Sequence, residues 1–285
     1  FRAAQRGALD LVSITRTHSR HRLAAVAHNG RNRNAKDKIL SLELESISVA
    51  FGGFKALDDV TISLKKAEIV GLIGPNGAGK TTCVNIITGF QDPTSGTVML
   101  DGQDINAKAP YDIRRRGLAR TFQAGRLFSG LDVLDNLAVT GVGLGHSRRA
   151  SEDEALRVLS WMGAGHLAEL PAAGLPYTDE RRVGIARALM FAPDYLLLDE
   201  PAAGMSETEA DDLAQIIRRI ADELNCGVLL IEHNVGLVLS LSNHVYVLDA
   251  GKIIEEGDKT EILASQAVRE AYLGAEHAPE NMEHA

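Results

Sequence analysis

The sequence predicts a mixed α/β fold, and three observations support this prediction. Short apolar runs suited to buried strands alternate with segments of helical periodicity along most of the chain. One such run, Ile69 to Ile73, leads into a glycine-rich loop and then into a helix-like segment, Thr82 to Ile87. Another apolar run begins at Tyr195 and ends in two adjacent carboxylates. Strands that alternate with helices in this way are typical of α/β proteins.

The glycine-rich loop carries the most specific motif in the chain. Residues 74–81 read GPNGAGKT and fit the pattern G-x-x-x-x-G-K-[ST] of a phosphate-binding loop. Its glycines let successive backbone N–H groups face an anion, and the following helix directs its positive end to the same place. We expect Lys80 to reach the β- and γ-phosphates of a nucleoside triphosphate and the Thr81 hydroxyl to ligate Mg²⁺. The loop residues expected at the nucleotide are Gly74, Asn76, Gly77, Ala78, Gly79, Lys80, Thr81 and Thr82.

Two strands are predicted before the loop. Leu40 to Leu44 and Val60 to Leu64 alternate apolar and polar residues, and Phe51 to Leu57 between them reads as a turn with two aromatic side chains. Phe51 could stack on a base presented near the loop. It could equally fill the core, which is the more frequent role of a phenylalanine.

Further strand and helix patterns follow the loop. Thr94 to Gly102 reads as turn, strand and turn, and Ile113 to Arg120 as a short basic helix. Residues 124–190 look mainly helical, with a flexible interruption at Gly141 to Ser147. The later predictions are strands at Gly227 to Ile231 and Val245 to Leu248, a hairpin at Gly251 to Ile254, and helices at Leu237 to Ser242 and Val268 to Leu273.

Carboxylates and a histidine follow two of these strands. Asp199 could hold Mg²⁺ through water, and the adjacent Glu200 could polarise an attacking water molecule. Paired acids after a strand often only cap a helix, but a nucleotide loop requires an acidic partner, so we favour a catalytic role. His233 follows the strand at 227–231, where it could contact the γ-phosphate, although a single histidine is more often structural.

The overall composition argues against several functions. The 285 residues carry a net charge of −8, and 45% of them are hydrophobic, which is ordinary for a globular core. An acidic domain of this kind is a poor candidate for binding nucleic acid. No run of about 18 apolar residues is present, so no segment is predicted to span a membrane alone. Cys83 and Cys226 lie in apolar surroundings without zinc-site spacing, which predicts buried, reduced thiols in a cytosolic protein.

Residues 1–38 differ from the rest of the chain. They contain nine Lys or Arg residues against two Asp residues and show no apolar periodicity. We predict a basic, disordered N-terminal extension, while an arginine-rich targeting segment and a basic segment next to a membrane remain open alternatives. Phe1 in place of methionine suggests a trimmed chain or a fragment of a longer one. The polar residues 275–285 are predicted to form a flexible tail.

The motifs in residues 39–274 resemble those of the nucleotide-binding subunits of ABC transporters. GPNGAGKTT from Gly74 is similar to the Walker A motif of that family, YLLLDE from Tyr195 to its Walker B motif, and PAAGM from Pro201 to its D-loop. The resemblance implies a P-loop NTPase core of the ABC ATPase type, with an antiparallel β subdomain and a helical subdomain at about residues 124–190. It also implies that the chain binds ATP and Mg²⁺ and hydrolyses ATP.

The resemblance implies roles for individual side chains. Glu200 would be the catalytic base, His233 the switch histidine, and Phe51 the aromatic residue that stacks on adenine. Gln123 matches the Q-loop glutamine, which senses Mg²⁺ and contacts the permease. The catalytic set would be Glu200, His233 and Gln123, and the metal ligands would be Thr81, Gln123 and Asp199.

Finer features resemble the subgroup that serves branched-chain amino acid importers. They include ARTFQAGRLFSGLDVLDNL around Gln123, RRVGIARAL before the Walker B motif and REAYLG near the C-terminus. The resemblance implies a peripheral subunit on the cytoplasmic face of the inner or plasma membrane. It would pair with a second ATPase, identical or related, beneath membrane permeases that a substrate-binding protein supplies. Urea, amides and other small polar solutes remain open as the cargo.

One segment departs from the family pattern. The signature loop stands here as Leu175, Pro176, Tyr177, Thr178 and Asp179, with Thr178 in place of the central glycine. In the family this loop contacts the γ-phosphate held by the opposite subunit. Threonine adds a Cβ where the backbone approaches phosphate and disfavours a positive φ, so Thr178 is expected to weaken the composite site. Asn234 also replaces an aspartate that is common after the switch histidine, which we expect to be a milder change.

The sequence also bears on two alternatives to a transport ATPase. A soluble ABC-type ATPase of translation or DNA repair usually joins two ATPase halves or carries a long coiled coil, whereas this chain has one half and no heptads. A nucleotide-binding regulator with low turnover is suggested by Thr178, but the presence of Glu200 and His233 argues against it.

Overall fold

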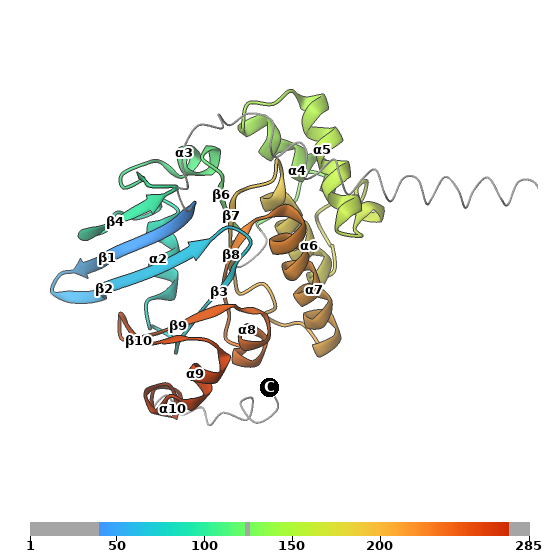
Figure 1. Cartoon of the computed structure of the whole chain (residues 1–285). Coiled ribbons are helices and arrows are strands. Elements are labelled where there is room, and N and C mark those ends of the chain that lie inside the picture. Colours follow the sequence, from blue (N-terminus) through green and yellow to red (C-terminus); the bar gives the residue numbers. More distant parts are fainter. Residues whose placement is uncertain (1–39, 123–125, 274–285) are drawn as a thin grey trace, which may run out of the picture. The chain divides into compact units, whose positions relative to one another are not determined.

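The computed structural model of the chain describes residues 40–122 and 126–273 (Figure 1). The chain divides into two units, residues 1–38 and residues 39–285, and the description below concerns the second. The predicted N-terminal extension, Gln123 and the predicted tail at 275–285 lie outside the described residues.

An antiparallel sheet is formed by the first strands in the order β2-β1-β4-β5. Leu44 of β1 pairs with Ile62 of β2 on one side and with Val98 of β4 on the other, so apolar side chains from three strands share one buried face. The strands are β1 (Ser41–Phe51), β2 (Phe54–Lys65), β4 (Ser95–Leu100) and β5 (Gln103–Asp104).

The turn predicted between β1 and β2 is shorter than expected. The prediction that Phe51 to Leu57 forms a turn is wrong, because β1 continues to Phe51 and β2 begins at Phe54. Gly52 and Gly53 both have positive φ angles, of 52° and 95°, which lets two residues reverse the chain. Phe51 and Phe54 therefore face each other as the last pair of the hairpin.

A second, six-stranded sheet has the order β10-β9-β3-β8-β7-β6. All neighbouring strands in it are parallel except β10, which runs antiparallel to β9. Strands β3, β7 and β8 are buried along their whole length, as expected for a parallel sheet covered on both faces. The strands are β3 (Ile69–Ile73), β6 (Leu118–Arg120), β7 (Tyr195–Asp199), β8 (Gly227–Ile231), β9 (His244–Asp249) and β10 (Lys252–Gly257).

The basic helix predicted at Ile113 to Arg120 is only partly correct. Helix α3 (Pro110–Arg115) ends before Gly117, which has a φ of 100°. The following residues form β6, in which Leu118 pairs with Tyr195 at the edge of the parallel sheet. The apolar character of Leu118 and Ala119 supports burial in a sheet, and Gly117 breaks the helix that the arginines favoured.

Two apolar clusters cover the two faces of the parallel sheet. Alternate residues of β7 illustrate the arrangement, because Leu196 and Leu198 join one cluster whereas Leu197 joins the other. The first cluster includes the apolar faces of α5, α6 and α7, and the second includes α2 and the antiparallel sheet. Cys83 and Cys226 are buried free thiols, one in each cluster, which confirms their predicted burial.

The remaining elements are helices. Helices α4, α5 and α6 pack against one another in the range where a helical subdomain was predicted (Figure 1). Helices α7 and α9 were not predicted, although each starts with a capping box, Ser206 with Glu209 and Asp258 with Glu261, that the sequence displays.

None of the helices in residues 40–122 and 126–273 is both long and apolar enough to cross a membrane. The helices not yet given are α2 (Lys80–Ile87), α4 (Val133–Gly143), α5 (Arg148–Trp161), the short 3₁₀ helix η1 (Gly165–Leu167), α6 (Tyr177–Leu189), α7 (Glu207–Leu224), α8 (Val235–Leu241), α9 (Lys259–Ala264) and α10 (Gln266–Leu273).

Candidate active site

The predicted phosphate-binding loop connects β3 to α2. Gly74 and Gly79 are required by the protein itself, since a Cβ on Gly74 would lie 1.9 Å from the Leu248 carbonyl oxygen and one on Gly79 would lie 2.7 Å from Leu57. Gly77 differs, because a Cβ there would meet no protein atom within 4 Å. Its φ of 81° and its open surroundings leave the loop backbone accessible to a ligand. The geometry fits a loop that receives phosphate oxygens.

The Lys80 side chain lies over this loop. Its ammonium group donates to the carbonyl oxygens of Gly74, at 2.6 Å, and Pro75, at 3.0 Å. Burial lowers the pKa of Lys80, and the nearby carboxylates of Glu200 and Asp199 oppose that shift. The carboxylates at the end of β7 therefore act electrostatically on Lys80, although they are more than 100 residues away in sequence.

The other loop residues also occupy positions that suit an anion. Gly79 is the N-cap of α2 and has no side chain that could accept a hydrogen bond. Because no side chain caps the helix, its first N–H groups are available to a ligand. Ala78 is buried, and its N–H donates to the Pro75 carbonyl oxygen at 3.2 Å, which closes the turn. Asn76 and Thr81 are exposed and Thr82 is half-buried.

Asp199 ends β7 at the same edge of the sheet. Its backbone pairs with Ile231 of β8, which in turn pairs with Leu72 of β3, so the three strand ends lie together. Burial raises the pKa of the Asp199 carboxyl, and the Arg120 guanidinium, 3.4 Å from Oδ2, opposes that shift. A carboxylate here and the Thr81 hydroxyl are the hard oxygen ligands that Mg²⁺ prefers, so these residues fit that ion.

Glu200 and His233 are brought together by the ends of β7 and β8. Glu200 Oε1 lies 2.9 Å from His233 Nε2. The Glu200 backbone has a positive φ of 48°, which is costly for a residue with a side chain, and its N–H donates to the Ile231 carbonyl oxygen at 2.9 Å. The strained turn directs the Glu200 side chain toward His233 rather than along the strand.

Two charged residues at this site were not assigned by sequence reasoning. Glu232 is 3% exposed, and its carboxylate accepts the N–H groups of Ala202, at 2.6 Å, and His233, at 3.2 Å. Burial raises the pKa of Glu232, while these two hydrogen bonds oppose the shift. The sequence does indicate Glu232, because this carboxylate stands between a buried strand and His233. The Glu232 carboxylate therefore fixes the backbone at Ala202, which follows Glu200, and the backbone at His233.

Arg120 is the second of these residues. Its guanidinium donates to Asn85 Oδ1 of α2 at 2.9 Å and to Oγ1 of Thr88, the C-cap of α2, at 3.2 Å, and also contacts Asp199. The group lies 4.8 Å from the ring centroid of Phe122, just before Gln123. Arg120 therefore links α2, β7 and the segment that leads to the predicted Q-loop. Gln123 itself lies outside the described residues.

Phe51 is exposed at the end of the β1–β2 hairpin. With 56% of its surface accessible, it does not fill the core, so that alternative is excluded. The residues after Phe54 approach the loop, because Ala56 O lies 2.8 Å from the position of a Cβ on Gly79. Strand β2 therefore passes the phosphate-binding loop at Ala56, two residues after Phe54, the partner of Phe51 in the hairpin.

The predicted signature residues lie at the start of α6. Pro176 is the N-cap and Thr178 lies in the first helical turn, so its φ is not positive and the strain that a positive φ would bring is absent. The Thr178 hydroxyl donates to Glu209 Oε1 at 2.5 Å. Tyr177 contacts the Arg181 guanidinium, which lies 4.9 Å from its ring centroid. Leu175 packs against the core, and Asp179 lies in the first turn of the helix.

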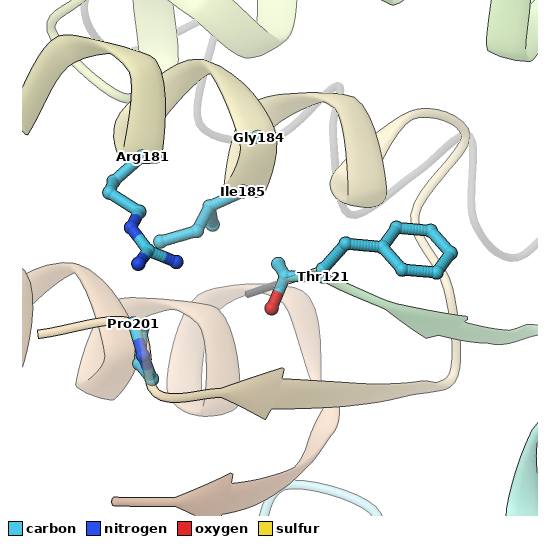
Figure 2. Close-up of a pocket in the computed structure, with 6 residues that line it drawn as sticks. Thr121, Arg181, Gly184, Ile185 and Pro201 are labelled. Carbon is cyan, nitrogen blue, oxygen red and sulfur yellow. The ribbon is translucent and has the colours of Figure 1, made fainter. Parts of the chain in front are cut away.

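A small pocket lies where three predicted functional segments meet. Figure 2 shows the Arg181 side chain extending from α6 toward Pro201, with Thr121 and Ile185 beside it. Arg181 is 7% exposed, and its Nε has no hydrogen-bond partner among the described residues. The pocket is lined by Thr121, Phe122, Arg181, Gly184, Ile185 and Pro201.

Comparisons with known proteins agree with this geometry. The ABC transporter family matches residues 57–203. The high-affinity branched-chain amino acid transport ATP-binding proteins BraF of Pseudomonas aeruginosa and LivG of Escherichia coli are each 39% identical to this chain, over 82% of it and 97% of their own length. The solved structure of MJ1267 in its ADP conformation, described as an ATP-binding cassette of an ABC transporter, has a TM-score of 0.74 and 33% identity. That alignment covers 82% of this chain and 99% of MJ1267. The chain thus belongs to the ABC transporter family, as one of its ATP-hydrolysing cassettes.

Proposed function

We propose that this chain hydrolyses ATP to power an importer of branched-chain amino acids. The Glu200 and His233 pair, 2.9 Å apart at the strand ends beside the phosphate-binding loop, is the observation that carries the hydrolytic part. The names of BraF and LivG, which cover most of this chain, support the choice of cargo. Urea, amides or other small polar solutes are the alternative cargo.

In this proposal each strand end contributes one part of the reaction. Lys80 exchanges its hydrogen bonds to Gly74 and Pro75 for the β- and γ-phosphates of ATP. Thr81, Asp199 and Gln123 would hold Mg²⁺, which would supply positive charge to offset charge that develops on the phosphates. Glu200 accepts a proton from the attacking water, and His233 orients Glu200 and contacts the γ-phosphate.

The nucleotide would be held from three sides. The first N–H groups of α2, which no side chain caps, would meet the phosphates, and Phe51 would stack on adenine from the exposed hairpin end. The signature residues 175–179 of the partner subunit complete the site. We further propose that residues 39–274 form the ATPase domain and that α4, α5 and α6 belong to its helical subdomain.

The partners would be a second ATPase, identical or related, and membrane permeases supplied by a substrate-binding protein. The subunit would sit at the cytoplasmic face of the membrane through its permease. Phe90 and Phe128 support a permease contact, because both large apolar side chains are more than half exposed and each lies beside an arginine.

Steady-state ATP hydrolysis of the purified chain, alone and with its permease complex, tests the proposal. Glu200→Gln is expected to lower kcat about 10²- to 10⁴-fold, since the general base is lost, while ATP binding is kept. Glu207→Gln, an exposed carboxylate at the start of α7, is the matched control and should turn over like the parent. Tight ATP binding without turnover in either setting would contradict the proposal and favour a regulatory nucleotide-binding protein.

A further inference from the structure

The start of α6 contacts the segment that follows Glu200. A Cβ on Gly204 would lie 3.3 Å from Tyr177 Cε1, so the Tyr177 ring packs closely over Gly204. The next residue, Thr178, donates its hydroxyl to Glu209 Oε1 at 2.5 Å. Arg182 lies one turn later, with its guanidinium 3.5 Å from Asp212. Three residues in the first two turns of α6 therefore contact either Gly204 or the first two turns of α7.

The acceptor, Glu209, is also part of the capping box of α7. Its Oε2 accepts the Ser206 N–H at 2.9 Å and the Ser206 hydroxyl at 2.8 Å, while Oε1 accepts the hydroxyl of Thr178. The bond from Thr178, followed by those from Ser206, lowers the pKa of Glu209 to about 2, so the carboxylate is ionised at neutral pH. A hydrogen bond to an ionised acceptor is stronger than one between neutral groups.

We propose that Thr178 is a positioning residue, whose hydroxyl bond to Glu209 joins the start of the signature helix to the N-terminal cap of α7. The signature segment then moves together with residues 201–206, which follow the catalytic carboxylate. A glycine at position 178 has no hydroxyl and cannot make this connection. The inference rests on the proposed function, because the signature segment matters for turnover only in a pair of ATPases.

Hydrogen exchange of the full chain without nucleotide tests the connection itself. Thr178→Val keeps the shape of the side chain and removes the hydroxyl, so the amides of residues 180–183 should exchange about fivefold faster, as expected for loss of one such bond. Thr178→Ser should restore the parent rate. Thr208→Val removes a hydroxyl from an exposed position on the first turn of α7 and is the matched control. Parent-like exchange in Thr178→Val, or valine-like exchange in Thr178→Ser, would overturn the proposal.

The consequence for the paired state is measured by ATP-dependent dimerisation in a Glu200→Gln background. Thr178→Val should weaken the dimer about fivefold, and Thr178→Ser should not. Glu209→Ala also removes the capping box of α7, so the double variant should lose less affinity than the sum of the two single variants. Full additivity of the two changes would overturn the coupling. If the Glu200→Gln parent does not dimerise with ATP, the proposed function is at fault, and the exchange measurement still decides whether Thr178 joins the two helices.

Discussion

The phosphate-binding edge of the sheet and the signature segment are built in different ways. The first lies at the ends of β3, β7 and β8, three strands buried along their whole length. The second lies at the half-exposed start of α6, where its contacts to α7 are polar or packed against Gly204. A rigid scaffold suits groups that must hold phosphate and water within a narrow geometry. A segment proposed to meet another subunit is better placed on side-chain contacts that can rearrange.

The same contrast appears in how each region treats its charged groups. At the sheet edge, Asp199 and Glu232 are buried, and burial raises the pKa of both carboxyls, so each depends on fixed partners such as Arg120 or backbone N–H groups. At the signature segment, hydrogen bonds dominate instead and lower the pKa of Glu209. Losing a partner should therefore cost more at the sheet edge.

The largest effect on ATP affinity is expected from Lys80→Ala. Removing the ammonium group should weaken ATP binding about 10- to 100-fold, because charged hydrogen bonds to the phosphates are lost. Titration with a fluorescent ATP analogue measures this, with Lys108→Ala, an exposed lysine away from the loop, as the control. Equal affinities for the two variants would remove the lysine from the nucleotide site.

Glu232→Ala tests whether the proposed catalytic pair, Glu200 and His233, needs the backbone contacts behind it. The buried N–H groups of Ala202 and His233 lose their acceptor, which should cost about 1–3 kcal/mol of unfolding free energy. The kcat should fall about tenfold with little change in KM, since Glu200 and His233 lose their alignment rather than ATP its binding groups. Glu232→Gln keeps one acceptor oxygen, so its kcat and its stability should lie between those of the parent and of Glu232→Ala. An unchanged kcat would show that Glu232 serves stability alone.

Two glycines of one loop offer a matched pair. Gly79→Ala places a Cβ against Leu57 and Ala56, so it should destabilise the chain by about 1–3 kcal/mol more than Gly77→Ala, which meets no protein atom. Gly77→Ala should instead weaken ATP binding at nearly parental stability, apart from the strain of its positive φ. Thermal unfolding and ATP titration of both variants separate the two effects. Equal losses of stability would contradict the distinction.

The smallest effect is expected from the Cβ of Thr178. Comparing Thr178→Gly with Thr178→Val isolates it, because both variants lack the hydroxyl. If the Cβ hinders close approach to the partner's phosphate, the glycine variant should turn over about two- to threefold faster in the assembled transporter. Equal ATPase rates would rule out a steric role of this residue in the composite site.

The features that depend on contiguous residues could be predicted from the sequence. The strand, loop and helix around Lys80, the acids at the end of β7 and the fold class were all predictable, because the motif and the apolar runs are contiguous. The exposure of Phe51 was not, since both a core role and a surface role were compatible with its neighbours. The strand β6 was also missed, because its three residues acquire a strand conformation only through pairing with β7.

The tertiary structure alone decided which distant side chains meet. Glu200 and His233 are 33 residues apart and Thr178 and Glu209 are 31 apart, so no local pattern specifies their contacts. Arg120 and Glu232 gain their roles in the same way, from groups on neighbouring strands and helices. Parallel strand order brings the carboxyl ends of non-consecutive strands to one edge, and the starts of α6 and α7 meet through the contacts of Thr178 and Arg182. These contacts depend on how the two sheets and their helices pack, so they form only in the folded chain.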